Sequence, residues 1–298
     1  MEKIVIILLN YNNYKDTIEC IKSIKQNTSE NNFIYEIVVV DNKSTNESLL
    51  ELKKIEGITL IQASKNAGFS SGNNIGIKYA IENKSEYILL LNNDTIITEN
   101  SIDKMYLELK KHHDIGIMSS RIMYWENKDL INCCGGEIDY FKGTAVIYGK
   151  GKEYKHNDKE FTYTKFVTGC CMLIKTKIIE DIGFLPDEYF MYYEDVDFCA
   201  KVQQKGYKIG VCLSSIIYHK ESAASGGAES PFAIEWNTRN RIIFINKYKC
   251  YGILTKLFFY STRIIVAIKY KLKNQRESLK ALKKGIIEGR KFIKNGKE

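Results

Sequence analysis

The sequence predicts an α/β fold built on a mixed, mainly parallel sheet with helices on both faces, followed by a helical C-terminal extension. Nearly continuous apolar runs at residues 3–9, 35–40 and 86–91 are typical of parallel strands that are covered on both faces. Helical patterns at residues 14–26 and 71–83 separate these runs. The regular alternation of strand and helix through the N-terminal part favours a parallel arrangement.

Each further element follows from a local pattern. A shorter strand is predicted at residues 57–62. Beyond about residue 120 the alternation stops, and segments 130–149 and 161–175 combine Gly, Tyr and Thr with short apolar runs that are typical of antiparallel strands. A helix is then expected at residues 194–205, and a strand at 207–218 that ends on a histidine.

The C-terminal part is predicted to be helical and is strongly basic. From Pro231 onward there are 17 Lys and Arg residues against 4 Glu, whereas the preceding 230 residues carry 27 basic and 32 acidic groups. The net charge of +8 therefore belongs to this tail. Lys256 and Arg263 interrupt its apolar stretch at 253–268, which falls short of the roughly 20 apolar residues that a membrane span needs.

These patterns predict two domains. A chain of 298 residues with 44% hydrophobic residues is long enough to bury a large core. We expect a catalytic domain at residues 1–230, with a nucleotide-binding half at about 1–120 and an acceptor half at about 121–230. Residues 231–298 are expected to form a basic helical extension.

The N-terminus and the cysteines predict a cytoplasmic protein. The opening MEKIVIILLN lacks the basic flank and the small-residue cleavage site of a secretory signal. The eight cysteines show no C-x-x-C metal spacing. A chain of this size does not need disulfides for stability, so we expect reduced thiols that lie mostly in the core.

Four polar clusters follow the predicted strands: Asn10-Tyr11-Asn12, Asp41-Asn42, Lys65 to Phe69, and Asn92-Asn93-Asp94. Ligands of open α/β sheets bind beyond the carboxyl ends of the strands. Asn, Asp and Gly are ordinary turn residues, so any one cluster is weak evidence. Four clusters at one edge of a sheet nevertheless predict a binding site there.

A second acidic point, Glu194, Asp195 and Asp197, stands at the start of the predicted helix at 194–205. Acidic residues are common in the first turn of a helix, so this run alone favours neither function nor structure. We expect Asp197, about 200° round the helix from Asp195, to point away from the site and to tolerate change to Asn.

The glycine pattern argues against several enzyme classes. Gly68, Gly72 and Gly76 are spaced by four, which matches neither the dinucleotide fingerprint nor the Walker loop. The first turn, NYNNYKD, contains no glycine, which disfavours a nicotinamide oxidoreductase. It also lacks the glycine-rich basic loop expected of a sugar-nucleotide nucleotidyltransferase. That class and a non-catalytic sugar-nucleotide-binding protein remain the alternatives, while the acidic first 230 residues disfavour nucleic-acid binding.

The motifs NYN, VVVDN, NAGFSSGNN, LLLNNDT, TGCCMLI and YYEDVDFCAKVQQKGY occur in an order that resembles glycosyltransferase family 2 enzymes of the GT-A fold, close to the rhamnosyltransferase-like branch. The likeness covers about residues 3–219. It implies an inverting hexosyl- or rhamnosyltransferase that uses a UDP- or dTDP-sugar donor, a hydroxyl acceptor, and Mg²⁺ or Mn²⁺.

The resemblance also implies roles for residues of the nucleotide site. Asn10 and Tyr11 would hold the base, with the Tyr11 ring available for stacking. Asp41 would accept the imide N–H of a uracil or thymine. Asn66 and Gly68 would line the nucleotide pocket.

The implied metal ligands are Asp94, which matches the last acid of the family's D-x-D motif, and His219, near the metal and the diphosphate. Asn92 stands where a strict D-x-D motif has its first acid. This departure leaves one carboxylate in the loop. We therefore expect modest metal affinity, completed by diphosphate oxygens and waters, as is common for Mg²⁺.

Asp195 matches the general base of the family's E-D motif, and Glu194 would contact the acceptor or the sugar, together with Asn93 and Gly169. The acceptor implied is a saccharide or a lipid-linked sugar in cell-surface polysaccharide or glycolipid assembly. Two alternatives stay open for the basic tail: contact with the anionic inner face of the cell membrane, or packing on the catalytic domain.

Overall fold

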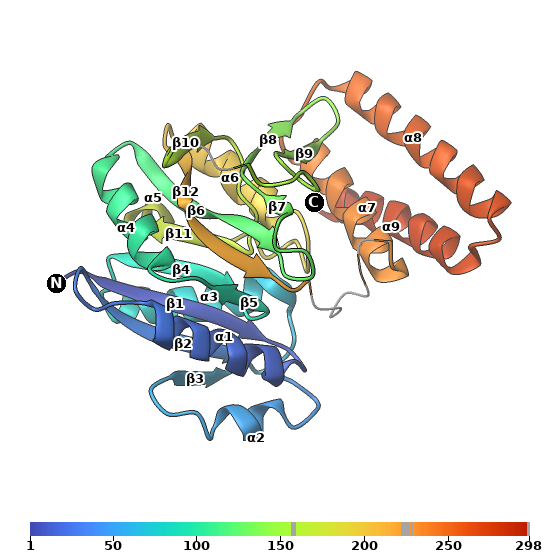
Figure 1. Ribbon diagram of the computed structural model, residues 1–298. Coiled ribbons are helices and arrows are strands. Elements are labelled where there is room, and N and C mark those ends of the chain that lie inside the picture. Colours follow the sequence, from blue (N-terminus) through green and yellow to red (C-terminus); the bar gives the residue numbers. More distant parts are fainter. Residues whose placement is uncertain (156–158, 222–226, 228, 297–298) are drawn as a thin grey trace. The chain divides into compact units, whose positions relative to one another are not determined.

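A computed structural model of the chain (Figure 1) describes residues 1–155, 159–221, 227 and 229–296. These residues form two compact units. The sheet unit comprises Met1–Glu137, Ile147–Phe190 and Glu194–Glu221. The helical unit comprises the C-terminal segment from Ser222 and two short excursions of the earlier chain, Ile138–Val146 and Met191–Tyr193.

Strands and helices alternate first, and antiparallel strands and the C-terminal helices follow. In chain order the elements are β1 (Lys3–Asn10), α1 (Tyr14–Asn27), β2 (Ile34–Asp41), α2 (Ser48–Leu52), β3 (Thr59–Gln62), α3 (Gly68–Glu82), β4 (Tyr87–Asn92), β5 (Thr95–Ile97), α4 (Ser101–Lys111), β6 (Ile115–Tyr124), β7 (Ile131–Cys133), β8 (Gly136–Asp139), β9 (Thr144–Ile147), β10 (Phe161–Thr164), β11 (Cys171–Lys175), α5 (Thr176–Ile182), α6 (Glu194–Gln204), β12 (Lys208–His219), α7 (Pro231–Lys247), α8 (Ile253–Leu272) and α9 (Arg276–Asn295).

The main sheet is mixed and mainly parallel, as the sequence predicts. Its strand order is β10-β12-β6-β11-β4-β1-β2-β3, with β5 paired to β12 and β7 paired to β6. Strands β1 to β4 run parallel to one another. Strand β11 lies between β4 and β6 and runs antiparallel to both. This inserted strand carries residues from the later part of the chain into the middle of the sheet.

Helices cover both faces of the sheet (Figure 1). The side chains of Ile4, Ile6 and Leu8 share one buried cluster with residues of α1 and α4. The alternate side chains of β1 face α3, where a Cβ atom on Gly76 would lie 2.6 Å from Ile7. The glycine spacing of α3, which matched no nucleotide motif, therefore allows this helix to lie close to β1.

The helical unit has its own small core. Ile242 and Ile245 of α7 and Phe259 of α8 are buried together. Helices α7 and α9 approach closely at Gly285. A Cβ atom there would lie 2.5 Å from a backbone carbonyl of α7, so the absence of a side chain allows this contact. In the described part of the chain, no helix combines the length and the apolar character that crossing a bilayer requires.

The two short excursions are hydrogen-bonded within the helical unit. Asn240 is fully buried and donates through Nδ2 to the carbonyl oxygens of Met191 (2.8 Å) and Tyr192 (2.9 Å). The Tyr193 hydroxyl donates to the carbonyl oxygen of Gly143 at 2.9 Å. The predicted boundary at residue 230, between the catalytic domain and the helical extension, remains a prediction.

Candidate active site

The strands that carry the polar clusters end level with one another. In the parallel pairings Asn10 lies opposite Asp41, and Leu9 lies opposite Asn92. The backbone N–H of Asn92 also donates to the carbonyl oxygen of Cys170 at 2.9 Å, next to the start of β11. Segments as far apart in the sequence as Asn10 and Cys170 therefore meet at one edge of the sheet.

A buried hydrogen-bond network joins the first two clusters. Asn10 donates through Nδ2 to Asp41 Oδ1 at 2.9 Å and accepts a bond from the Thr17 hydroxyl at 2.9 Å. The backbone N–H of Ser44 donates to the other oxygen of Asp41 at 3.1 Å. Asn10 and Asp41 have no exposed surface, whereas Tyr11 is 39% exposed. The Asn10 amide is thus committed to Asp41 and Thr17.

The loop that contains Asn66 and Gly68 is pinned on both sides. Asn66 Oδ1 accepts bonds from Asn42 Nδ2 (3.0 Å) and from the Gly68 backbone N–H (3.1 Å). Gly68 has φ +93°, and a Cβ atom there would lie 2.1 Å from the carbonyl oxygen of Phe190. The backbone N–H of Phe69 donates to the same oxygen at 2.7 Å. Only glycine fits this approach.

Asp94 and His219, the two predicted metal ligands, lie together. Asp94 Oδ1 is 3.1 Å from His219 Nε2, and Asn92 Nδ2 is 3.3 Å from the same nitrogen. His219 Nδ1 is buried and has no hydrogen-bond partner in the part of the chain that the structure describes. No group of three or more His, Cys, Asp or Glu side chains that could hold a metal is found among the described residues.

These side chains fit a partial metal site. A carboxylate and an imidazole suit Mn²⁺, and the carboxylate suits Mg²⁺. With only Asp94 and His219 as candidate protein ligands, most of the coordination shell would come from phosphate oxygens and waters. The pair therefore fits an ion that arrives together with a diphosphate.

Asp195, the predicted base, is held at the start of α6 by backbone donors. Its Oδ2 accepts from the Gly169 N–H at 3.1 Å, and its Oδ1 accepts from the Val196 N–H at 2.8 Å. A Cβ atom on Gly169 would lie 3.2 Å from the Phe69 ring, so the first turn of α3 also packs here. The side chain of Thr168 also hydrogen-bonds to this carboxylate.

Glu194 and Asp195 form a pair of adjacent carboxylates with raised pKa values. Glu194 is 6% exposed, and its Oε2 is buried without a hydrogen-bond partner among the described residues. Burial and the neighbouring charge of Asp195 raise the pKa of Glu194 well above its usual range. Burial also raises the pKa of Asp195, although hydrogen bonds from Gly169, Val196 and Thr168 oppose the shift.

The contacts bear on two of the residues singled out in the sequence. Asn93 donates through Nδ2 to the Thr17 hydroxyl at 2.8 Å, so its amide nitrogen supports the strand-end network. The carboxylate of Asp197 is fully buried and accepts a bond from the Tyr189 hydroxyl at 3.0 Å. The expected tolerance of Asp197 to change to Asn stays a prediction, because an Asn side chain keeps an oxygen that can accept this bond.

Comparison with known proteins agrees with this geometry. The sequence profile of the family described as Glycosyl transferase family 2 matches residues 5–183. The chain is 30% identical over 248 residues to the low-salt glycan biosynthesis hexosyltransferase Agl10 of Haloferax volcanii, covering 83% of this chain and 76% of that protein. The chain belongs to glycosyl transferase family 2. Its membership makes it a glycosyltransferase and argues against the nucleotidyltransferase alternative.

Other relatives of this family 2 enzyme include the rhamnosyltransferase WbbL of Escherichia coli K12, 26% identical over 201 residues, covering 63% of this chain and 74% of that protein. Among solved structures, Staphylococcus aureus TarS 1–349 in complex with UDP-GlcNAc matches with a TM-score of 0.60 and 19% identity, covering 95% of this chain and 80% of that chain. GalNAc-T7 with UDP, GalNAc and Mn²⁺ matches with a TM-score of 0.65 and 15% identity, covering 83% of this chain and 48% of that chain. These likenesses confirm the GT-A fold.

Sequence reasoning missed two residues that hold the candidate site residues in place. The Thr17 hydroxyl is hydrogen-bonded to both Asn10 and Asn93, and the Phe69 ring packs close to Gly169. Thr17 lies within a helical pattern and gives no signal of its own. Phe69 stands inside the NAGFSSGNN motif, so its position was visible but its contact was not.

We predict that Glu194→Gln stabilises the protein increasingly as pH rises. The unfolded chain ionises Glu194 near its ordinary pKa, whereas the folded chain resists ionisation until its raised pKa. Between these two pKa values the wild-type free energy of unfolding therefore falls as pH rises, by roughly 1 kcal/mol per pH unit. Denaturant unfolding of both proteins between pH 4 and 9 measures the difference.

The control is Glu180→Gln, which removes an exposed carboxylate of α5 and should leave the pH dependence unchanged. A stability difference between Glu194→Gln and wild type that stays constant from pH 4 to 9 would contradict a raised pKa for Glu194.

Proposed function

We propose that this enzyme transfers a sugar, with inversion, from a UDP- or dTDP-sugar to a hydroxyl acceptor. The observation that supports this most directly is that the two acidic clusters meet just before β11. The backbone N–H of Gly169 donates to the Asp195 carboxylate, and the carbonyl oxygen of the next residue, Cys170, accepts the N–H of Asn92, two residues before Asp94. The loop of the proposed metal ligand and the proposed base are therefore both hydrogen-bonded to this pair of adjacent residues.

The nucleotide part of the donor is proposed to lie over the ends of β1 and β2. The exposed ring of Tyr11 is available to stack on the base, while Asp41 would accept its imide N–H. Because Asp41 is enclosed, this contact requires the chain around Ser44 to open. Asn10 then acts by orienting Asp41 rather than by touching the base. Asn66 shapes the pocket wall through its bond to Gly68.

Asp94 and His219 are proposed to hold Mg²⁺ or Mn²⁺. The ion would stabilise the negative charge that develops on the departing diphosphate. The protein residues keep these ligands in place: Lys220, next to His219, donates its backbone N–H to the carbonyl oxygen of Asp94 at 3.0 Å. Its ammonium group pairs with Asp16 at 2.7 Å, so β12 is tied to α1 beside the loop.

Asp195 is proposed to be the general base. The acceptor hydroxyl oxygen bonds to the sugar carbon as the bond from that carbon to the diphosphate oxygen breaks, and Asp195 takes the hydroxyl proton. A raised pKa brings the base closer to the working pH, which favours proton transfer. The raised pKa of Glu194 favours its protonated form, which could donate a hydrogen bond to the acceptor or the sugar, near Gly169.

The acceptor is proposed to be a saccharide or a lipid-linked sugar presented at the cytoplasmic face of the cell membrane. An exposed apolar stripe along α8 supports this location. We call it the α8 stripe; it consists of Leu254, Leu257, Ile264, Ile265, Ile268 and Leu272. Basic residues of the tail flank these positions, as in helices that lie on anionic membranes.

We predict that Asp195→Asn lowers the transfer rate by about 10²–10⁴-fold, the usual contribution of a positioned base. The amide keeps the shape of the side chain but cannot take the proton, so donor affinity should change little. Rates of sugar transfer, measured with a panel of UDP- and dTDP-sugars, test the effect.

Glu194→Gln should reduce the rate less, and mainly through acceptor affinity. Asp129→Asn makes the same chemical change at an exposed position and should leave the rate unaltered. Turnover of Asp195→Asn within threefold of wild type would remove Asp195 from the mechanism and redirect the search for the base to Glu194.

We predict that Asp94→Ala abolishes the metal dependence of nucleotide binding, because it removes the only carboxylate of its loop. Asn92→Asp should strengthen that dependence by adding a second carboxylate at the position of the missing acid. Calorimetry of UDP and dTDP binding, with and without Mn²⁺, measures both variants. If Mn²⁺ improves binding equally in wild type and in Asp94→Ala, the ion is held elsewhere.

We predict that the enzyme sediments with vesicles of anionic lipid at low salt. The double change Leu257→Gln with Ile264→Gln should weaken sedimentation several-fold, because it removes apolar surface from the α8 stripe. Leu50→Gln with Leu107→Gln, two exposed apolar positions of the sheet unit, is the matched control and should have no effect. Failure of the wild-type protein to sediment would exclude membrane contact through the tail.

A further inference from the structure

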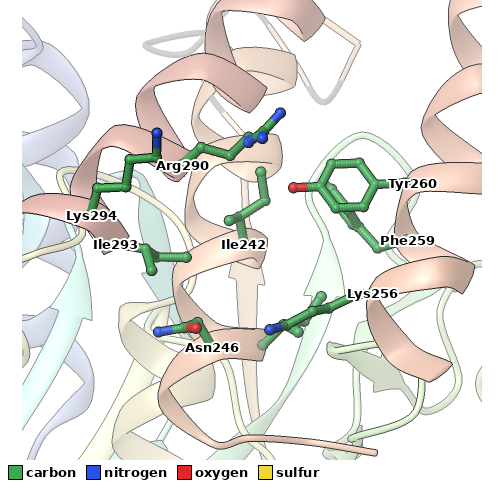
Figure 2. Close-up of a pocket in the computed structure, with 9 residues that line it drawn as sticks. Ile242, Asn246, Lys256, Phe259, Tyr260, Arg290, Ile293 and Lys294 are labelled. Carbon is green, nitrogen blue, oxygen red and sulfur yellow. The ribbon is translucent and has the colours of Figure 1, made fainter. Parts of the chain in front are cut away.

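A cavity of about 220 Å³ lies between the three helices of the helical unit. Its floor is apolar and is formed by Ile242 and Ile245 of α7, Phe259 of α8 and Ile293 of α9. Figure 2 shows the side chains of α8 and those of α9 facing each other across α7, with the Tyr260 hydroxyl directed toward Ile242.

Three cations line the same cavity: Lys256 from α8 on one side, and Arg290 and Lys294 from α9 on the other. Figure 2 shows the Lys256 ammonium group reaching toward Asn246. No acidic residue belongs to the lining, and none of the three cations has an ion-pair partner among the described residues. By contrast, Lys284 of the same helix α9 pairs with Glu235 at 2.9 Å. The charge at the cavity is therefore uncompensated.

The cavity lies at the border of the α8 stripe. Successive helical residues are about 100° apart, which places Leu257, Ile264 and Ile268 in one sector of α8. Lys256 and Tyr260 lie at the edge of that sector, between it and the buried Phe259. An apolar chain that covers the stripe would thus reach the cations of the cavity from the side.

We propose that this cavity binds the terminal phosphate of a membrane amphiphile, with Lys256, Arg290 and Lys294 around the phosphate oxygens. Arg offers paired N–H donors to phosphate, and Lys supplies a mobile point charge. The Tyr260 hydroxyl and the Asn246 amide provide further donors at the same opening. The apolar floor takes the first carbons that follow the phosphate.

The size of the cavity sets what enters it. Pockets for drug-sized ligands usually enclose about 300–1,000 Å³, so a volume of about 220 Å³ suits a headgroup and not a whole lipid. A phosphomonoester, which carries more charge than a phosphodiester and has no second substituent, fits three unpaired cations best. The inference rests on the membrane contact proposed above and adds a preference for one headgroup to it.

The test is sedimentation with vesicles that contain phosphatidic acid, a phosphomonoester, or phosphatidylglycerol, a phosphodiester, at matched surface charge. We expect at least tenfold tighter binding to phosphatidic acid. Arg290→Gln with Lys294→Gln should abolish this preference. Lys283→Gln with Lys291→Gln removes two charges from exposed positions of the same helix outside the cavity, and should keep it.

Equal binding to the two lipids, or equal loss in the two double variants, would overturn the cavity and leave membrane contact standing as a general charge effect. Absence of binding to either lipid would overturn both. Inorganic phosphate and glycerol 3-phosphate are tested as soluble ligands in the acetylation experiment that follows. If these anions protect Lys256 and Lys294 from acetylation as strongly as vesicles do, the site serves free phosphate, and a lipid ligand is overturned.

A measurement on the wild-type protein avoids any folding defect of the variants. Phosphatidic acid vesicles should protect Lys256 and Lys294 from acetylation by a water-soluble reagent, as read by mass spectrometry, more than phosphatidylglycerol vesicles do. Lys283 and Lys291 report general coverage of α9 and should be protected equally by both lipids. Equal protection of all four lysines by the two lipids would contradict the proposal. Transfer activity plays no part in this readout, so its outcome is independent of the role of Asp195.

Discussion

The hydrogen bond between Asn10 and Asp41 shows the constraint on which the site depends: polar groups at the buried end of a parallel sheet must satisfy one another. Each of the two residues ends a strand whose apolar residues fill the core, and neither has any exposed surface. Leaving either one unpaired would cost about 1–3 kcal/mol. The strands β1 and β2 must therefore end level, and β4 follows through its register with β1. Every later feature of the site is built on this edge.

The antiparallel strand β11 completes the edge from the opposite direction. Its first residue, Cys171, lies opposite Leu91 near the end of β4. The two residues just before it therefore contact both acidic segments: the carbonyl oxygen of Cys170 accepts the N–H of Asn92, and the N–H of Gly169 donates to Asp195. A diphosphate bound beside these carboxylates would be repelled by their charge, and the cation proposed above would offset that repulsion.

The sequence carried enough information for the architecture of the N-terminal part. Buried parallel strands leave long apolar runs, and the ends of β1, β2 and β4 differ from the predicted ends by at most one residue. Helix α3 begins at Gly68, three residues before its predicted start, because its first turn consists of glycine, aromatic and serine residues without an apolar period. The sequence analysis did not predict helix α4 or strand β6, which follow β5.

The contacts of the site were less accessible to sequence reasoning. Motif order indicated which residues gather at the edge, but not which of them point into it. The amides of Asn10 and Asn93 are used up by Thr17 and its neighbours, which depends on side-chain rotamers that no spacing encodes. Asp197 shows the same limit: the helical period gives its angle on α6, but not the buried tyrosine that occupies its carboxylate.

The close approach at Gly68 has a consequence for the order of events in turnover. The N–H of Phe69 and the missing Cβ of Gly68 hold the start of α3 against the carbonyl of Phe190, four residues before Glu194. If a donor displaced the chain at Gly68 in the proposed reaction, the chain that leads into α6 would move with it. The proposed donor and acceptor sides would then be coupled mechanically, and the two substrates would bind in a fixed order.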